Sequence, residues 1–120
     1  MVDYELAVLT YVGIVLRRNG YVVIEASTAK TGLNSALKSE AQIQLLITEV
    51  DMPVMAGLSL ARKIRLLNPE VPVLFISGQP RSDEFQGIAN SAYLEKPFSP
   101  TQLLEIVQRM ISDPKPLGVD

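Results

Sequence analysis

The sequence predicts an α/β fold in which helices cover both faces of a parallel sheet. Apolar segments of strand length alternate along the chain with longer segments whose apolar residues recur at helical spacing. Two strand-like segments, 45–48 and 71–77, are apolar at almost every position, which is typical of strands buried on both faces. A chain of 120 residues is long enough for one domain with its own core. We therefore expect one domain over residues 1–111, followed by a tail or linker over 112–120.

The first part of the chain predicts a helix, a strand and a second helix. We expect the first helix over 5–19, because Gly20 is well placed to end it. Residues 21–26 (YVVIEA) are rich in β-branched and aromatic side chains, a composition that favours a strand. Ser27 can cap a second helix over 27–39. The first of the two buried strands then follows.

The second part of the chain continues this alternation. Its expected elements are a helix over 57–67, a strand over 71–77, a weak helix over 82–89, a strand over 92–95 and a helix over 100–111. Asn68 and Pro69 close the first of these helices. Ser99 can cap the last one, and Pro100 suits its first helical position.

The composition excludes several classes of function. A net charge of -2 with 20% charged residues is ordinary for a globular domain and argues against a nucleic-acid binder. Cysteine and histidine are both absent, which excludes disulfides, thiolate nucleophiles, Ser-His-Asp catalysis and most zinc sites. No apolar stretch is long enough to span a bilayer, and no signal peptide is evident. We expect a cytoplasmic protein that binds neither nucleic acid nor membranes.

Polar side chains follow the predicted strands at the points where those strands end. Glu49 and Asp51 come after the first buried strand, Ser77 ends the second, and Lys96 follows the last. In parallel sheets, sites form outside the carboxyl ends of the strands. We therefore expect these side chains to meet at one edge of the sheet.

Several segments of the chain are similar to those of a known family. TEVDMPVMAG (48–57), VLFISG (73–78) and AYLEKPFSP (92–100), with LRRNGYVVIEAS (16–27), resemble the receiver domain of two-component response regulators. The resemblance runs from about residue 2 to residue 111. It implies a flavodoxin-like three-layer sandwich that acts in phosphorelay signalling and is not itself an enzyme. It also implies protein partners, either a histidine kinase or a downstream output protein.

The resemblance assigns a role to each residue at the strand ends. Glu49 takes the position of the aspartate that accepts a phosphoryl group from the kinase. Ser77 corresponds to the hydroxyl that follows this group, and Lys96 to the lysine that contacts it. Tyr93 corresponds to the residue that swings inward on activation. Pro97 matches a proline whose preceding peptide bond is cis.

The resemblance also implies a magnesium site, because Mg²⁺ neutralises the charge that develops in phosphoryl transfer. Its ligands would be Asp3, Glu49 and the main-chain carbonyl of Asp51. The second acid of the family's acidic pair is replaced by Tyr4, and a neutral phenol is a poor magnesium ligand. Glu49 reaches one methylene further than aspartate, which displaces a tightly placed reacting group. We therefore expect a weak or lost magnesium site and impaired phosphorylation.

Two features near the N-terminus leave room for another chain. Two residues precede Asp3, so the family's first strand, which lies in the middle of its sheet, is truncated or missing here. The chain is then a shortened form of a longer one, rearranges its sheet, or borrows a strand from a partner. The first helix also has a second apolar stripe, Ala7, Tyr11 and Ile14, which favours self-association or contact with the missing segment.

Three readings of the function stay open, and we expect the first. It is a degenerate receiver that signals through protein contacts, with Glu49 either imitating the phosphoryl charge or pairing with Lys96. The second is a working receiver in which Glu49 or Asp51 takes phosphate from a histidine kinase with Mg²⁺ present. The third is an unrelated module of the same fold that binds a small phosphorylated ligand. The absence of a glycine-rich phosphate loop after any strand speaks against the third.

Overall fold

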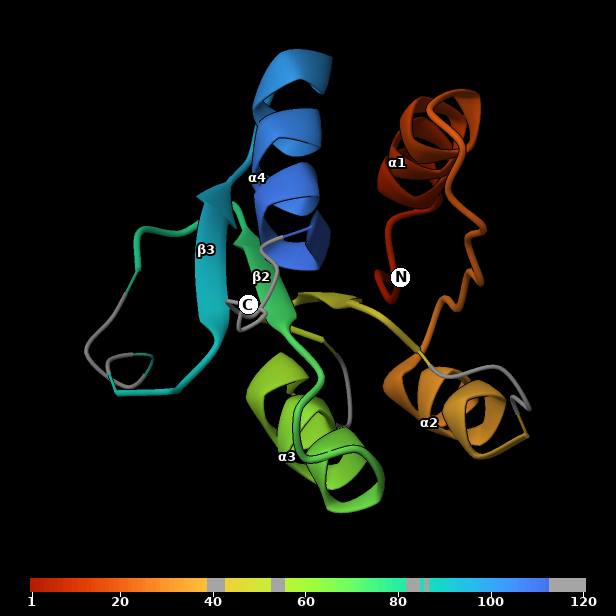
Figure 1. Cartoon of the computed structure of the whole chain (residues 1–120), viewed down its shortest axis with the longest axis vertical. Coiled ribbons are helices and arrows are strands. Elements are labelled where there is room, and N and C mark those ends of the chain that lie inside the picture. The colour runs from red at the N-terminus through yellow and green to blue at the C-terminus, as the bar shows by residue number, and fades with distance from the viewer. Residues whose placement is uncertain (39–42, 53–55, 82–84, 86, 113–120) are drawn as a thin grey trace, which may run out of the picture.

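The computed structural model describes residues 1–38, 43–52, 56–81, 85 and 87–112. Within these residues, helices cover both faces of a parallel sheet, as Figure 1 shows, so the predicted fold class is confirmed. The elements are α1 (Leu6–Arg18), α2 (Ala29–Lys38), β1 (Leu46–Glu49), α3 (Gly57–Leu67), β2 (Val73–Ser77), β3 (Ser91–Glu95) and α4 (Pro100–Ser112). None of the helices in these ranges is long and apolar enough to cross a membrane.

The sheet has a buried core on each face. Helices α1 and α4 cover one face, and α2 and α3 cover the other (Figure 1). Leu74 and Ile76 of β2 pack toward α1 and α4, whereas Val73 and Phe75, which alternate with them, pack toward the other two helices. All four side chains are at most 1% exposed. This two-sided burial explains why the sequence of β2 is apolar throughout.

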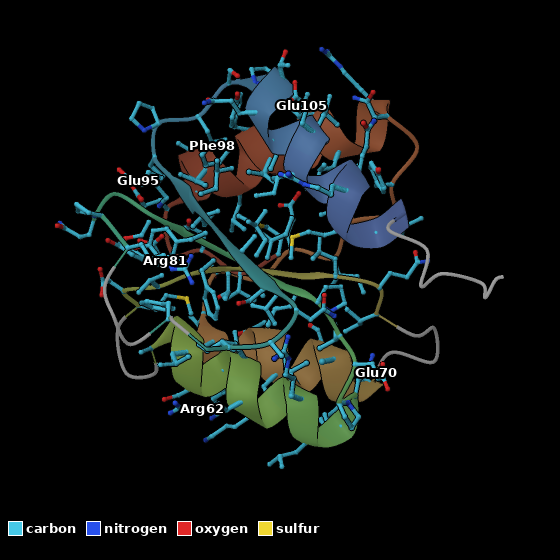
Figure 2. All side chains as sticks on the ribbon, turned by 60° about the vertical axis from the view of Figure 1, so that its left-hand side comes forward. Arg62, Glu70, Arg81, Glu95, Phe98 and Glu105 are labelled. Atoms are coloured by element: carbon cyan, nitrogen blue, oxygen red, sulfur yellow. The ribbon has the colours of Figure 1, made fainter. Side chains whose placement is uncertain are left out.

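The strands run parallel in the order β1-β2-β3. Their register pairs Glu49 with Ile76 and Ser77 with Glu95, so the carboxyl ends of all three strands meet at one edge. In Figure 2, Arg81 and Glu95 lie at this edge, and Glu70, which precedes β2, lies at the opposite one. The expected convergence of the strand ends is therefore confirmed.

Val2 occupies the place of a first strand as a single bridging residue. It forms parallel bridges with Ala26 on one side and with Thr48 of β1 on the other. The Val2 amide donates to the Ile47 carbonyl at 2.8 Å, and the Val2 carbonyl accepts from the Glu49 amide at 2.9 Å. This bridge carries Asp3 to the edge where the other strands end.

The predicted strand over 21–26 is wrong, because Ala26 alone pairs within it. Residues 21–25 are not part of the described sheet, and the side chains of Val22 and Ile24 are 96% and 46% exposed. Strand-forming composition reflects packing on a pleated surface and requires a neighbouring strand. The N-terminal segment that would provide this neighbour reaches only Ala26.

The capping residue differs from expectation at the start of α2 and agrees with it at the start of α4. The cap of α2 is Thr28 rather than Ser27, since the Thr28 hydroxyl accepts from the Thr31 amide at 3.0 Å. At the start of α4, Ser99 and Gln102 cap each other reciprocally, at 3.1 and 2.8 Å, as predicted for Ser99.

The weak helix predicted over 82–89 falls partly outside the described residues. Phe85 is 3₁₀-helical, whereas 87–89 are not helical, so the prediction is wrong over 87–89. Phe85 instead packs edge-on against Phe75, with ring centroids 4.9 Å apart.

Candidate functional site

The ammonium group of Lys96 lies among three carboxylates at the carboxyl edge of the sheet. Its Nζ is 2.6 Å from Glu5 Oε1, 3.0 Å from Asp3 Oδ2 and 3.2 Å from Glu49 Oε2. Asp3 is fully buried and Glu49 is 4% exposed, whereas the Glu5 side chain is about half exposed at 49%. We call Asp3, Glu5, Glu49 and Lys96 the Lys96 cluster.

Main-chain contacts place the members of this cluster. The Glu49 amide donates to the Val2 carbonyl at 2.9 Å, which fixes the end of β1 against the N-terminal segment. The Lys96 amide donates to the Ser77 carbonyl at 2.7 Å and so follows the end of β2. Gly57, at the start of α3, approaches Glu49 so closely that an added Cβ would overlap the Glu49 carbonyl oxygen. The glutamate is therefore held by backbone on two sides.

Burial and charge act in opposite directions within the Lys96 cluster. Neither Asp3 Oδ2 nor Glu49 Oε2 accepts a well-formed hydrogen bond from the described residues, so their contact with the ammonium is electrostatic. Burial raises the pKa of Glu49, and Lys96 only partly offsets this effect. Burial by itself would lower the pKa of Lys96, but Glu5, Asp3 and Glu49 more than compensate and raise it. Lys96 therefore stays charged, whereas burial disfavours the ionised form of Glu49.

We expect Glu49→Gln to remove a pH dependence of stability. The folded pKa of Glu49 lies above its ordinary value of 4.5, so the folded state binds this proton more tightly than the unfolded state. The resulting stabilisation is complete below pH 4.5 and is lost as the pH rises through the folded pKa. The free energy of unfolding in urea, measured from pH 4 to pH 8, should thus fall less steeply in Glu49→Gln than in wild type.

The matched control for this measurement is Glu105→Gln, which changes an exposed carboxylate on α4. Its difference in unfolding free energy from wild type should stay constant across the same pH range. If the difference in unfolding free energy between Glu49→Gln and wild type were equally constant with pH, the pKa of Glu49 would not be raised by burial.

The other predicted site residues lie around the Lys96 cluster without joining it. Ser77 is fully buried, and its hydroxyl accepts from the Gln79 amide at 3.0 Å. The Tyr93 hydroxyl donates to the Gln79 carbonyl at 2.9 Å, and its ring packs edge-on against Phe85. The peptide bond between Lys96 and Pro97 is cis. Asp51 is exposed in a bend after β1, whereas Glu49, the last residue of β1, is buried.

Glu5 makes the shortest of the three carboxylate contacts with Lys96, yet the sequence predicted it only as part of the first helix. It occupies the N-cap position of α1 without a side-chain capping hydrogen bond, and its amide donates to Asp3 Oδ1 at 2.8 Å. This bond links the two acids, which are two residues apart. The sequence did contain a signal for this role. Glu5 is the second acid of the segment VDYE, and only Tyr4 separates it from Asp3.

The arrangement of these side chains does not fit Mg²⁺. Magnesium requires near-octahedral oxygen ligands. In the described part of the chain, no group of three or more acidic, histidine or cysteine side chains is arranged to hold a metal ion. The Lys96 ammonium lies 3.0 Å from Asp3 Oδ2 and 3.2 Å from Glu49 Oε2, so it contacts one oxygen of each carboxylate that the resemblance assigns to the metal. The positive charge at this edge is thus supplied by a lysine.

Comparison with known proteins places most of the chain in one family. The family model described as the response regulator receiver domain matches residues 1–108. The sensor kinase CckA of Brucella abortus is 29% identical over 99 residues, 80% of this chain and 10% of that protein. The regulatory protein VanR of Enterococcus faecium is 31% identical over 114 residues, 92% of this chain and 48% of that protein. The chain therefore spans between a tenth and a half of these curated relatives.

Solved structures show the same similarity in three dimensions. The chemotaxis protein CheY4 of Vibrio cholerae superposes with a TM-score of 0.83 at 27% identity, covering 91% of this chain and 93% of that one. The receiver domain of the hybrid histidine kinase CckA gives a TM-score of 0.81 at 32% identity, covering 92% and 95%. The predicted flavodoxin-like fold is confirmed by these likenesses.

Proposed function

Because this chain belongs to the response regulator receiver domain family, we propose that it is a degenerate receiver that signals through protein contacts and is poorly phosphorylated. Receiver domains act in two-component signalling. The finer proposal rests on one observation, the binding of Lys96 by three carboxylates at once. This proposal states how the chain uses the residues at its phosphoacceptor position.

Phosphoryl transfer depends on a nucleophile in line with the phosphorus and on cations aimed at the developing charge. We propose that Glu49 stands at the acceptor position and that Lys96 is the cation. In the Lys96 cluster this cation is already neutralised by Asp3, Glu5 and Glu49. An incoming phosphoryl group would have to break contacts of 2.6–3.2 Å before Lys96 could bind it.

A permanently paired Glu49 and Lys96 would hold the neighbouring surface in one state. Lys96 follows β3, which carries Tyr93, and the hydrogen bond from Tyr93 to the Gln79 carbonyl joins β3 to the turn after β2. We propose that Tyr93 is the residue whose position a partner reads and that Ser77 supports the turn. A histidine kinase or an output protein would then recognise a fixed surface.

Intact mass after incubation with acetyl phosphate and Mg²⁺ tests this proposal. We expect wild type to gain almost no phosphoryl mass, and Glu49→Asp to gain it about 100-fold faster, because shortening the side chain restores the reach of an aspartate. Asp51→Asn in the Glu49→Asp background is the control and should leave this gain intact.

Rapid phosphorylation of wild type would overturn the proposal in favour of a working receiver. Mapping the adduct would then distinguish Glu49 from Asp51 as the acceptor. If Glu49→Asp also stays unmodified, the extra methylene of Glu49 is not what blocks transfer, and the proposed effect of its reach is overturned.

Self-association through α1 remains a proposal for the partner surface. Its apolar stripe is divided in the structure: Tyr11 packs near Phe98, with ring centroids 5.9 Å apart, and donates to the Phe98 carbonyl at 3.0 Å. Ala7 and Ile14 stay exposed. Sedimentation of wild type and Ile14→Lys over a range of concentrations would reveal a dimer that depends on this stripe.

A further inference from the structure

The positive charges of helices α2 and α3 are not balanced by acids within those helices. Their sequences, AKTGLNSALK and GLSLARKIRLL, contain lysine and arginine but neither aspartate nor glutamate. The whole chain, in contrast, has 13 acidic residues and 11 basic ones. The two helices lie side by side on one face of the sheet (Figure 1), and this pair of helices therefore carries an excess of positive charge.

Three leucines near the C-terminal ends of these helices are exposed. Leu66 and Leu67 of α3 are 84% and 53% exposed, and Leu37 of α2 is 58% exposed. A helix dipole favours a cation in the last turn, but it does not account for exposed leucines there. Exposed apolar side chains that gather within a charged surface are typical of an interaction site.

The two helices end at the same edge of the sheet. Helix α2 precedes β1 and α3 precedes β2, and these strands are parallel, so both helices end at the edge where the strands begin. The side-chain amide of Asn68, which follows α3, donates at 3.2 Å to the carbonyl of Ile43, which precedes β1. The three exposed leucines therefore lie at one end of the helix pair, at the opposite edge of the sheet from the Lys96 cluster.

The contacts of Arg65 show which flank of α3 faces α2. Its guanidinium donates to the carbonyls of Val71 and Asn90, which precede β2 and β3, so Arg65 faces the β3 side of the molecule. Figure 1 shows α2 on the other side of α3 from β3. Residues two positions apart are rotated by about 200° around a helix. Lys63 and Leu67 therefore lie on the opposite flank from Arg65, toward α2.

The same rotation identifies the flank of α2 that faces α3. Ser35 lines the space beside residues 20–24, which follow α1 and lie on the far side of α2 from α3 (Figure 1). Leu37, two positions later, lies on the opposite flank, toward α3. Lys30 precedes Leu37 by seven residues, which is close to two full turns, and lies on the same flank. The residues exposed along the facing flanks, with Leu66, form the α2–α3 face: Lys30, Leu37, Lys63, Leu66 and Leu67.

The lysines of the α2–α3 face are available to a partner. Lys30 and Lys63 are both exposed, and none of the ion pairs among the described residues includes either of them. Each lysine precedes a leucine of its own helix, by about 10 Å along the axis of α2 and about 6 Å along that of α3. A complementary partner would therefore carry acids one to two helical turns away from its apolar side chains.

We propose that the α2–α3 face binds an acidic amphipathic helix of a partner polypeptide. A helix laid along α2 and α3 can place its apolar stripe on the leucines of both while its carboxylates approach the lysines. The excess of positive charge on the two helices attracts an acidic segment and disfavours a basic one. The proposal goes beyond the proposed signalling function, because it concerns a different edge of the molecule and does not depend on phosphorylation.

The helices of this chain do not have the chemistry of the proposed occupant. Among the helices that the structure describes, α1 contains no acid, and α4 contains Glu105 together with the basic Arg109. Neither helix is acidic. The α2–α3 face is thus complementary to a helix from a different polypeptide rather than to one from a second copy.

The binding test uses the full chain and a fluorescent helical peptide of about four turns, with leucine along one stripe and glutamate elsewhere. Fluorescence anisotropy should show saturable binding that Lys63→Glu weakens about tenfold, because this change reverses a charge of the α2–α3 face. Arg109→Glu makes the same change of charge at an exposed position on α4 and should leave binding unaltered. Equal weakening by both variants would show non-specific attraction and would overturn the proposal.

The contribution of the leucines is tested separately. Leu66→Ser should weaken binding about fivefold, and the 84% exposure of Leu66 means that the core stays intact. The control is Leu6→Ser on α1, where the replaced side chain is 67% exposed, and it should bind as wild type does. A peptide whose leucines are replaced by alanine should bind much more weakly. Equal binding of this peptide, or no effect of Leu66→Ser, would overturn the proposal.

Three further outcomes would assign the α2–α3 face differently and overturn the proposal. The first is the absence of peptide binding together with binding to vesicles that contain an anionic phospholipid, which would indicate a membrane surface. The second is a dimer of the chain alone that Lys63→Glu dissociates, which would indicate a second copy. The third is the absence of binding in all of these measurements, which would leave the face solvated.

Discussion

Replacing Lys96 by methionine should lower the free energy of unfolding by about 3–5 kcal/mol. Methionine keeps most of the length of the lysine stem but removes the ammonium group. Asp3, which is fully buried, and Glu49, which is 4% exposed, would then face each other without a counter-charge. Removing one partner of a buried ion pair leaves an uncompensated charge, which costs far more than the intact pair contributes. Urea unfolding at pH 7 would measure the difference.

Lys63→Met is the matched control for this prediction, since Lys63 is exposed on α3. It should change the unfolding free energy by no more than about 0.5 kcal/mol. The double variant Lys96→Met/Glu49→Gln should recover part of the loss, because one of the unpaired charges is gone. Equal stabilities of Lys96→Met and Lys63→Met would show that the Lys96 cluster does not hold the fold together.

Gly57→Ala should lower the free energy of unfolding by about 1–3 kcal/mol, the usual cost of overpacking. The added Cβ would overlap the Glu49 carbonyl oxygen and lie 3.2 Å from Val50 Cα. These neighbours are backbone atoms of Glu49 and Val50, so they cannot move aside by a change of side-chain rotamer. In a helix interior, the same substitution would normally stabilise the protein. Urea unfolding at pH 7 would measure the loss.

Gly78→Ala is the control for Gly57→Ala. No heavy atom lies within 4 Å of a Cβ built at Gly78, which follows β2 at the same edge of the sheet. Its unfolding free energy should therefore differ from that of wild type by no more than about 0.5 kcal/mol. If Gly57→Ala were equally harmless, the close contact between α3 and Glu49 would not constrain the site.

The elements that were predicted correctly are those that signals within their own segment of sequence determine. Helix α3 was predicted over 57–67 and is found there, because its apolar spacing and the Asn68-Pro69 stop are both local signals. The apolar run that forms β2 could be read as a strand because both faces of the sheet are covered. The strand over 21–26 failed for the opposite reason. Its formation depends on a second segment of chain that residues 1–3 provide at one position only.

The sequence predicted where the candidate site lies, but it predicted only some of the residues that form it. Parallel strands bring Glu49, Ser77 and Lys96 to one edge, and their order along the chain was enough to infer this. Glu5 was missed because an acid at the start of a helix usually serves the helix dipole and is solvated. Asp51 was assigned to the magnesium site through its main-chain carbonyl, and that assignment stays a prediction.

The Lys96 cluster also bears on how such a domain would respond to the composition of the cell. The ammonium is covalently part of the chain, so its local concentration is fixed and does not follow the supply of divalent ions. Its contacts of 2.6–3.2 Å are also much shorter than the distance of about 8 Å over which physiological salt screens charges. Variation in ionic strength would therefore leave these contacts in place, and the charge that neutralises the buried acids would not depend on a dissolved ion.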